Sequence, residues 1–204
     1  MGKILLSTAY LPPVEYFSLV AGPDDIIIEK EESYLKQSYR NRCYILCAHG
    51  PLLLSVPVLE GSRHNVPVKE ARIDYSKRWQ QVHLRAMMTA YKSSPYFDFY
   101  FEPLEKIISV NHEFLIDLNT SILEALLKML KINKLISFTA DFEPLNDEQY
   151  DWRYRINPGK ESHTLLKSYF QVFDTGKGFI PNLSITDLIF NLGPESGRYL
   201  RPNY

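Results

Sequence analysis

The stretch "KILLSTAYLPPVEYFSLVAGPDDIIIE", residues 3–29, decides the fold class. It begins with a short apolar run at 3–8, passes two prolines, continues with apolar residues over 14–21, and reaches three consecutive isoleucines at 26–28. Gly22-Pro23 stops the expected helix, and a short β-branched run favours a strand. The order strand, helix, strand predicts a parallel pair joined by a crossover, which is the Rossmann-like start of an α/β fold.

The next part of the chain predicts a β-hairpin followed by helices. Apolar runs at 44–48 and 52–58 flank the turn signal His49-Gly50-Pro51. Apolar residues then recur at helical spacing over a segment at roughly 76–132, which Ser94-Pro95 divides. We therefore expect a mixed sheet with a β-hairpin, covered by this helical segment.

Three further strands are expected, at 68–73, 136–139 and 169–173. The polar stretch at 141–165 predicts irregular structure. Near the end of the sequence, Ser184 precedes an apolar run as a helix cap would, and Gly193-Pro194 predicts the stop of that helix.

Length, composition and charge limit the classes of protein. A chain of 204 residues can bury one sizeable core, so we expect a single domain over 1–204. No run of about 18 apolar residues occurs, which predicts a cytoplasmic protein without membrane insertion. The 23 basic and 24 acidic residues give a net charge of -1, so nucleic acid is an unfavoured partner, although aromatic and basic residues alternate over 34–44.

Several common sites lack their motifs. Neither a GxGxxG nor a GxxxxGK[ST] loop occurs, and the sequence identifies no cofactor. The five histidines form neither HxH nor HExxH, which predicts no metal site. Cys43 and Cys47 lie in an expected strand about 13 Å apart, too far for a disulfide.

A cluster of cationic side chains follows the acidic run at 29–32. Lys36, Arg40 and Arg42 supply donors, and a guanidinium binds a phosphate or carboxylate through two parallel hydrogen bonds. Tyr10 follows the first strand, where open α/β sheets bind ligands. The cluster predicts a small phosphorylated or carboxylated ligand, and the alternative is a solvated network of ion pairs with the neighbouring glutamates.

Two histidines are candidates for acid–base chemistry. His64 lies in a polar loop beside Arg63, whereas His83 lies one helical turn from Trp79. A half-buried structural imidazole is the alternative for His83. Arg78, His83 and Arg85 line a second positive wall if the N-terminus of this helix faces the binding cleft.

Short motifs in order along the chain carry a family resemblance. They are Tyr10-Leu-Pro, Tyr16-Phe17, Tyr34-x-Lys36, Asn41-Arg42, Val56-Pro57-Val58, the helix from Trp79 to His83-Leu84, Ser94-Pro95-Tyr96-Phe97, Asp117-Leu118-Asn119, and the closing stretch at 179–195. Together they resemble the WbqC-like protein family, a bacterial group associated with O-antigen and other surface-polysaccharide biosynthesis. The chain departs from the family pattern at Thr8-Ala9, where relatives commonly carry Gln-Pro, and in a short segment at 151–167.

The resemblance implies a role in a glycan pathway without fixing the chemistry. Combined with the Rossmann-like first crossover and the nearby cationic donors, it leads us to expect a transferase-type enzyme acting on an activated sugar or a nucleotide-linked intermediate, with glycan-pathway proteins as further partners. The alternative is a non-catalytic binding or scaffolding protein for those enzymes. The predicted ligand-binding residues are Tyr10, Tyr34, Lys36, Arg40, Asn41, Arg42, Trp79 and Arg85. The predicted acid–base residues are His83 and His64.

Overall fold

The computed structural model describes residues 2–22, 25–59, 66–142, 144, 150–173, 176 and 178–201. Within these ranges the chain forms a mixed α/β fold, as predicted. The strands are β1 (Lys3–Ser7), β2 (Asp25–Glu29), β3 (Arg42–Cys47), β4 (Gly50–Ser55) and β5 (Ile136–Phe138). The helices are α1 (Val14–Val20), α2 (Trp79–Tyr91), α3 (Phe97–Ser109), α4 (Leu115–Met129), α5 (Ile185–Leu192) and α6 (Ser196–Tyr199), with 3-10 turns η1 (Val68–Glu70) and η2 (Gly193–Glu195).

The first strands form a parallel sheet in the order β1-β2-β5. Leu5 pairs with Ile27, which in turn pairs with Ser137. β1 and β2 share one burial pattern, because alternate side chains of each point into the core. The predicted strand-helix-strand start is confirmed. The carboxyl ends of β1, β2 and β5 meet at one edge of this sheet.

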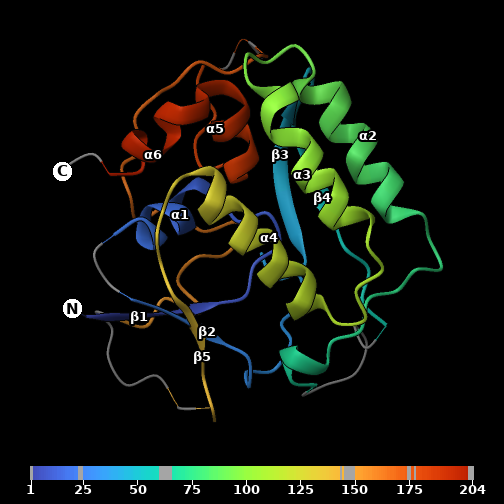
Figure 1. The fold of residues 1–204 in the computed structure, drawn as a ribbon, viewed down its shortest axis with the longest axis vertical. Helices are drawn as coiled ribbons and strands as arrows, with labels where there is room; N and C mark the ends of the chain where they lie inside the picture. The colour runs from blue at the N-terminus through green and yellow to red at the C-terminus, as the bar shows by residue number, and fades with distance from the viewer. Residues whose placement is uncertain are drawn as a thin grey trace.

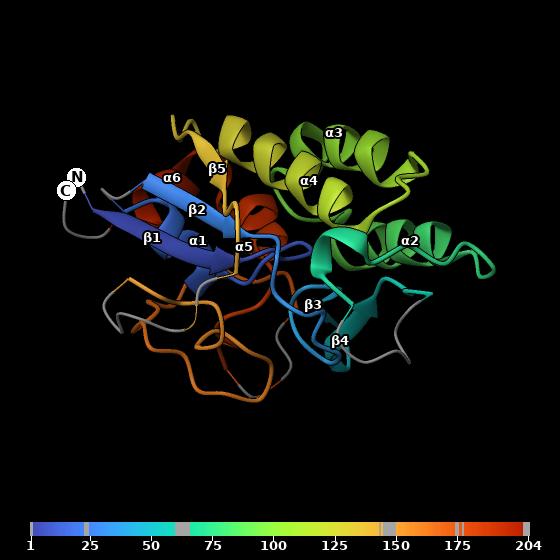
Figure 2. The same cartoon turned by 90° about the horizontal axis from the view of Figure 1, so that it is seen from below.

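β3 and β4 form the predicted hairpin as a separate antiparallel sheet. A two-stranded sheet is marginally stable alone, so it needs support from other elements. The Tyr91 hydroxyl at the end of α2 accepts a hydrogen bond of 2.9 Å from the Leu46 backbone N–H. Figures 1 and 2 show the parallel sheet at one end of the molecule and the hairpin toward the other. In Figure 2, α2, α3 and α4 all lie above the hairpin.

The predicted helical segment is confirmed as α2, α3 and α4, with one difference at a helix start. α3 begins at Phe97 rather than at Ser94-Pro95. The Ser94 hydroxyl instead donates to the carbonyl of Tyr91, the last residue of α2. The serine therefore closes one helix rather than capping the next.

Two predicted strands are wrong, at 68–73 and 169–173. The first contains η1, followed by isolated bridges at Arg72 and Ile73. In the second, the Tyr169 hydroxyl and the Gln171 amide both donate to the buried Asp187 carboxylate in α5. These side-chain hydrogen bonds to α5 hold the segment in place. Among the described residues, no strand pairs with it.

The capped helix near the end is confirmed. The Ser184 hydroxyl accepts a hydrogen bond from the Thr186 backbone N–H, and α5 ends at Leu192 with Gly193 as its C-cap. In the part of the chain that the structure describes, no helix is both long and apolar enough to cross a membrane.

Candidate functional site

Arg40 is enclosed at the carboxyl edge of the parallel sheet, with 2% of its surface exposed. Its Nε lies 2.9 Å from Oε1 of Glu32, and its Nη2 also contacts Oε2 of Glu32. The same Nη2 donates to the Ser7 hydroxyl at the end of β1, at 2.8 Å. Nε and Nη2 of Arg40, which the sequence suggested for a ligand, therefore bind a carboxylate and a hydroxyl of the protein itself.

A second buried arginine extends this network. Arg153 Nη1 lies 2.8 Å from Oε2 of Glu29, and Arg153 Nε lies 3.0 Å from Oδ1 of Asp151. The Ser7 hydroxyl joins the two halves by donating to the Arg153 carbonyl at 2.7 Å. Arg153 and Asp151 were missed because they lie in the stretch predicted to be irregular. A bridge between Leu5 and Asp151 brings that stretch beside β1.

The other cationic candidates lie apart from this network. Lys36 and Arg85 are exposed, and Arg42 is half-buried with an Nε that has no hydrogen-bond partner among the described residues. Tyr34 lies near both Arg42 and Arg40. Burial raises its pKa to about 12, and the two guanidinium charges act in the opposite direction.

Tyr10, Trp79 and His83 come together, but inside the protein. The Tyr10 hydroxyl lies 2.9 Å from Nδ1 of His83, and the imidazole ring is 5.1 Å from the Trp79 ring. Desolvation lowers the pKa of His83 to about 4, against a smaller opposite effect of a hydrogen bond to the Ser55 backbone. The imidazole is therefore neutral at pH 7, and its geometry fits the structural alternative.

The remaining two candidates are Asn41 and His64. The Asn41 amide N–H donates a hydrogen bond of 2.8 Å to the Val56 carbonyl and so fixes the chain after the hairpin. In the part of the chain that the structure describes, its Oδ1 has no hydrogen-bond partner. His64 lies outside the described residues. The acid–base and ligand-binding roles expected of these residues remain predictions.

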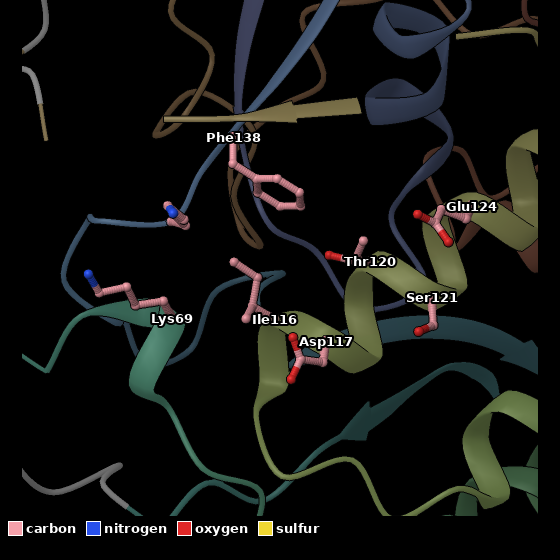
Figure 3. A pocket seen from close by; sticks show the side chains of 8 residues that line it. Lys69, Ile116, Asp117, Thr120, Ser121, Glu124 and Phe138 are labelled. Atoms are coloured by element: carbon pink, nitrogen blue, oxygen red, sulfur yellow. The ribbon is translucent and has the colours of Figure 1, made fainter. Parts of the chain in front are cut away.

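An open groove of about 540 Å³ lies elsewhere along the same edge of the sheet. Phe138 ends β5, and Lys30 follows β2 directly. Helix α4 forms the facing wall, and η1 contributes Lys69. Figure 3 shows the Phe138 ring and the Thr120 hydroxyl directed into the space between β5 and α4. The lining consists of Lys30, Lys69, Ile116, Asp117, Thr120, Ser121, Glu124 and Phe138.

The groove carries charges of both signs. Lys69 Nζ forms an ion pair of 2.6 Å with Glu31, and Lys30 Nζ lies 3.9 Å from the same carboxylate. On α4, Asp117 and Glu124 are exposed and have no ion-pair partner among the described residues. A ligand in the groove would meet ammonium groups on one side and carboxylates on another.

The sequence offered one weak signal for this groove. Asp117, Thr120, Ser121 and Glu124 recur at spacings of three and four residues, which gives a helix one polar face. Most such faces are simply solvated. The opposing wall comes from Lys30, Lys69 and Phe138, and their proximity to α4 depends on long-range packing. Local patterns do not report such packing.

Among the described residues, no group of three or more histidine, cysteine, aspartate or glutamate side chains is placed to hold a metal ion.

Comparison with known proteins identifies the family. The chain is 27% identical over 223 residues to the uncharacterized protein Rv1507c of Mycobacterium tuberculosis, and the match covers 97% of this chain and 96% of that protein. No solved structure matches the chain. Residues 8–169 match the WbqC-like protein family, and this span includes the whole groove. The chain belongs to the WbqC-like protein family.

Proposed function

We propose that this protein, as one domain over 1–204, is a cytoplasmic transferase-type enzyme. Its substrate would be an activated sugar or a nucleotide-linked intermediate of surface-polysaccharide biosynthesis. The observation that carries the proposal is the groove at the carboxyl ends of β2 and β5. Open α/β sheets bind ligands outside the carboxyl ends of their strands, and 540 Å³ falls within the usual range for a small-molecule site.

The groove contains the side chains that an activated sugar needs. Lys30 and Lys69 supply ammonium donors for phosphate oxygens. The Phe138 ring offers an apolar face to the C–H side of a sugar ring. Thr120 and Ser121 supply hydroxyls that can donate to, and accept from, sugar hydroxyl groups.

These groups also suit the transfer step. In that step the bond between the sugar and its phosphate breaks, and the lysines stabilise the charge that develops on the leaving phosphate. The acceptor oxygen bonds to the same sugar carbon. Asp117 or Glu124 accepts the proton that the acceptor hydroxyl loses.

A ligand panel tests the proposal. Nucleotides, nucleotide sugars, sugar 1-phosphates and acyl carriers are added separately to the protein while its melting temperature is recorded. We expect nucleotide sugars or sugar phosphates to raise the melting temperature, because a ligand that binds only the folded state stabilises it. Binding is then quantified by calorimetry.

Matched variants connect the binding to the groove. Lys69→Met is expected to weaken binding about tenfold, whereas Lys92→Met, at an exposed position after α2, leaves it unchanged. If no compound in the panel raises the melting temperature, the proposal fails, and the scaffolding alternative gains support. Equal loss of binding in both variants would place the ligand outside the groove.

A further inference from the structure

The positive side of the groove holds a partly neutralised pair of lysines. Glu31 lies between Lys69, at 2.6 Å, and Lys30, at 3.9 Å. The hydrogen bond to Glu31 raises the pKa of Lys69, so the ammonium form persists at neutral pH. The two ammonium groups share the Glu31 carboxylate, and the charges of Glu70 and Asp141 also act on Lys69. The lysines therefore supply donors for a phosphate rather than a large excess of positive charge.

The negative side is not neutralised in this way. Asp117 and Glu124 line the groove without an ion-pair partner among the described residues. Figure 3 shows Lys69 and Glu124 on opposite sides of the hollow, with Thr120 between them. A ligand that reaches from the lysines along α4 therefore meets two uncompensated negative charges.

A ligand carrying only phosphate suits this groove poorly. Its anionic end is complementary to Lys30 and Lys69, but its remainder brings no positive charge to Asp117 and Glu124. A magnesium ion shared by both carboxylates is disfavoured, because seven residues of helix separate them by about 10.5 Å along the axis. A ligand with a phosphate at one end and an ammonium group at the other is complementary to both sides.

We propose that the sugar bound in this groove is an amino sugar, presented as its phosphate or as a nucleotide-linked form. The phosphate lies at Lys30 and Lys69, and the ammonium group is read by Asp117 or Glu124. This inference rests on the proposed function and narrows its substrate class.

Two probes that differ in one group provide the test. Glucosamine 1-phosphate and glucose 1-phosphate are titrated into the protein by calorimetry, in buffer containing EDTA. The first carries an ammonium group at the carbon where the second carries a hydroxyl. We expect the amino compound to bind three- to tenfold more tightly, and we expect this preference to shrink at high salt because the groove is open to solvent.

Variants assign the preference to the two carboxylates. Asp117→Asn and Glu124→Gln keep the shape of each side chain and remove its charge, and at least one of them is expected to bring the two affinities together. Asp98→Asn removes a charge from an exposed position in the first turn of α3, outside the groove, and should leave the preference unchanged.

The outcomes separate this inference from the proposed function. Equal binding of the two probes, or a preference that survives both carboxylate variants, overturns the inference but leaves a sugar phosphate site standing. Binding that appears only when magnesium replaces EDTA also overturns it, because the carboxylates would then act through a metal. Absence of binding by sugar phosphates and nucleotide sugars alike overturns the proposed function itself.

Discussion

Arg40 and Glu32 form an ion pair inside the protein, with Arg40 Nε 2.9 Å from Glu32 Oε1 and side chains 2% and 0% exposed. Eight residues separate them in the chain, and the pair lies at the edge of the sheet where a ligand would be expected. Because the remaining Nη2 contact of Arg40 is to Ser7, the pair ties the segment after β2 to the end of β1.

Removal of one partner should be strongly destabilising. We expect Arg40→Met to lower the free energy of unfolding by about 3–5 kcal/mol, because it leaves the Glu32 carboxylate buried without a counter-charge. Urea unfolding followed by circular dichroism measures the change. Lys36→Met removes a nearby exposed charge and should stay within about 0.5 kcal/mol of the wild type.

The double variant Arg40→Met, Glu32→Gln provides the check on this explanation. It should recover a large part of the lost stability, since no buried charge remains unpaired. A double variant no more stable than Arg40→Met would show that packing, rather than charge, accounts for the effect.

His83 predicts a specific dependence of stability on pH. Its pKa is about 4 in the folded protein, below the ordinary value of 6.5, because the imidazole is buried. The unfolded chain therefore binds a proton between these values that the folded protein does not, and stability falls as the pH decreases from 6.5 toward 4. The contribution of this residue amounts to about 3 kcal/mol by pH 4.

Comparison with His83→Gln isolates this contribution from those of other groups. Denaturant unfolding of the wild type and the variant between pH 4 and 8 should give curves that converge as the pH falls through this range. His49→Gln, at an exposed position in the hairpin turn, should run parallel to the wild type. A constant difference between wild type and His83→Gln would contradict the lowered pKa.

The sequence predicted those parts of the fold that depend on local chemistry. The apolar strands around α1, the turn at Gly50 and the helical spacing over 79–129 each lie within a short window. The segment at 169–173 was misread because an apolar alternation fits a strand. In the folded chain, Tyr169 and Gln171 instead satisfy the carboxylate of Asp187, which lies in a later helix.

The candidate site was harder to predict because its contacts join residues that lie far apart in the sequence. The sequence showed several glutamates near Arg40, and no local pattern indicated that Glu32 would be its partner. Arg153 reaches Glu29 across 124 positions of the chain, and no local pattern indicates this contact. The facing walls of the groove likewise come from α4 and β5, which are distant in the sequence. The sequence pattern indicated only the polar face of α4.

The Asp187 network makes a graded prediction about hydrogen bonding. Tyr91 donates to Asp187 Oδ1 at 2.8 Å and also accepts from the Leu46 backbone N–H. Tyr169 donates to Oδ2 of Asp187 and has a further hydrogen bond with the side chain of Gln171, which itself keeps a bond to Asp187. Tyr91→Phe removes the hydroxyl that binds both the Leu46 backbone N–H and Asp187 Oδ1. It should lower the free energy of unfolding by about 2–3 kcal/mol, against about 1–2 kcal/mol for Tyr169→Phe. Thermal and urea unfolding of both variants measure the order, with Tyr100→Phe as the control. The reverse order would show that the Leu46 contact adds nothing.

Gly193 is required where α5 ends. Its φ is +54°, and a Cβ built there would lie 2.5 Å from ring carbons of Tyr96. We expect Gly193→Ala to destabilise the protein by more than about 1 kcal/mol, since backbone strain and a clash with the ring act together. Gly159 also has a positive φ, of +83°, but a Cβ built there would have no neighbouring atom within 4 Å. Gly159→Ala therefore reports the backbone strain alone and should cost less, and equal losses would remove the role assigned to the Tyr96 contact.

Phe138 makes the last prediction, which concerns the ligand rather than stability. Its side chain is 42% exposed and points into the groove, so little of the core depends on it. If the ring packs against a sugar, Phe138→Ala should weaken binding of a nucleotide sugar about tenfold while Phe138→Tyr retains it, because the tyrosine ring offers a similar face. Phe99→Ala removes a more exposed ring, 75% exposed on α3, and serves as the control for loss of an aromatic side chain. Calorimetry measures the affinity of the three variants for the nucleotide sugar. Wild-type affinity in Phe138→Ala would show that the ring does not contact the ligand.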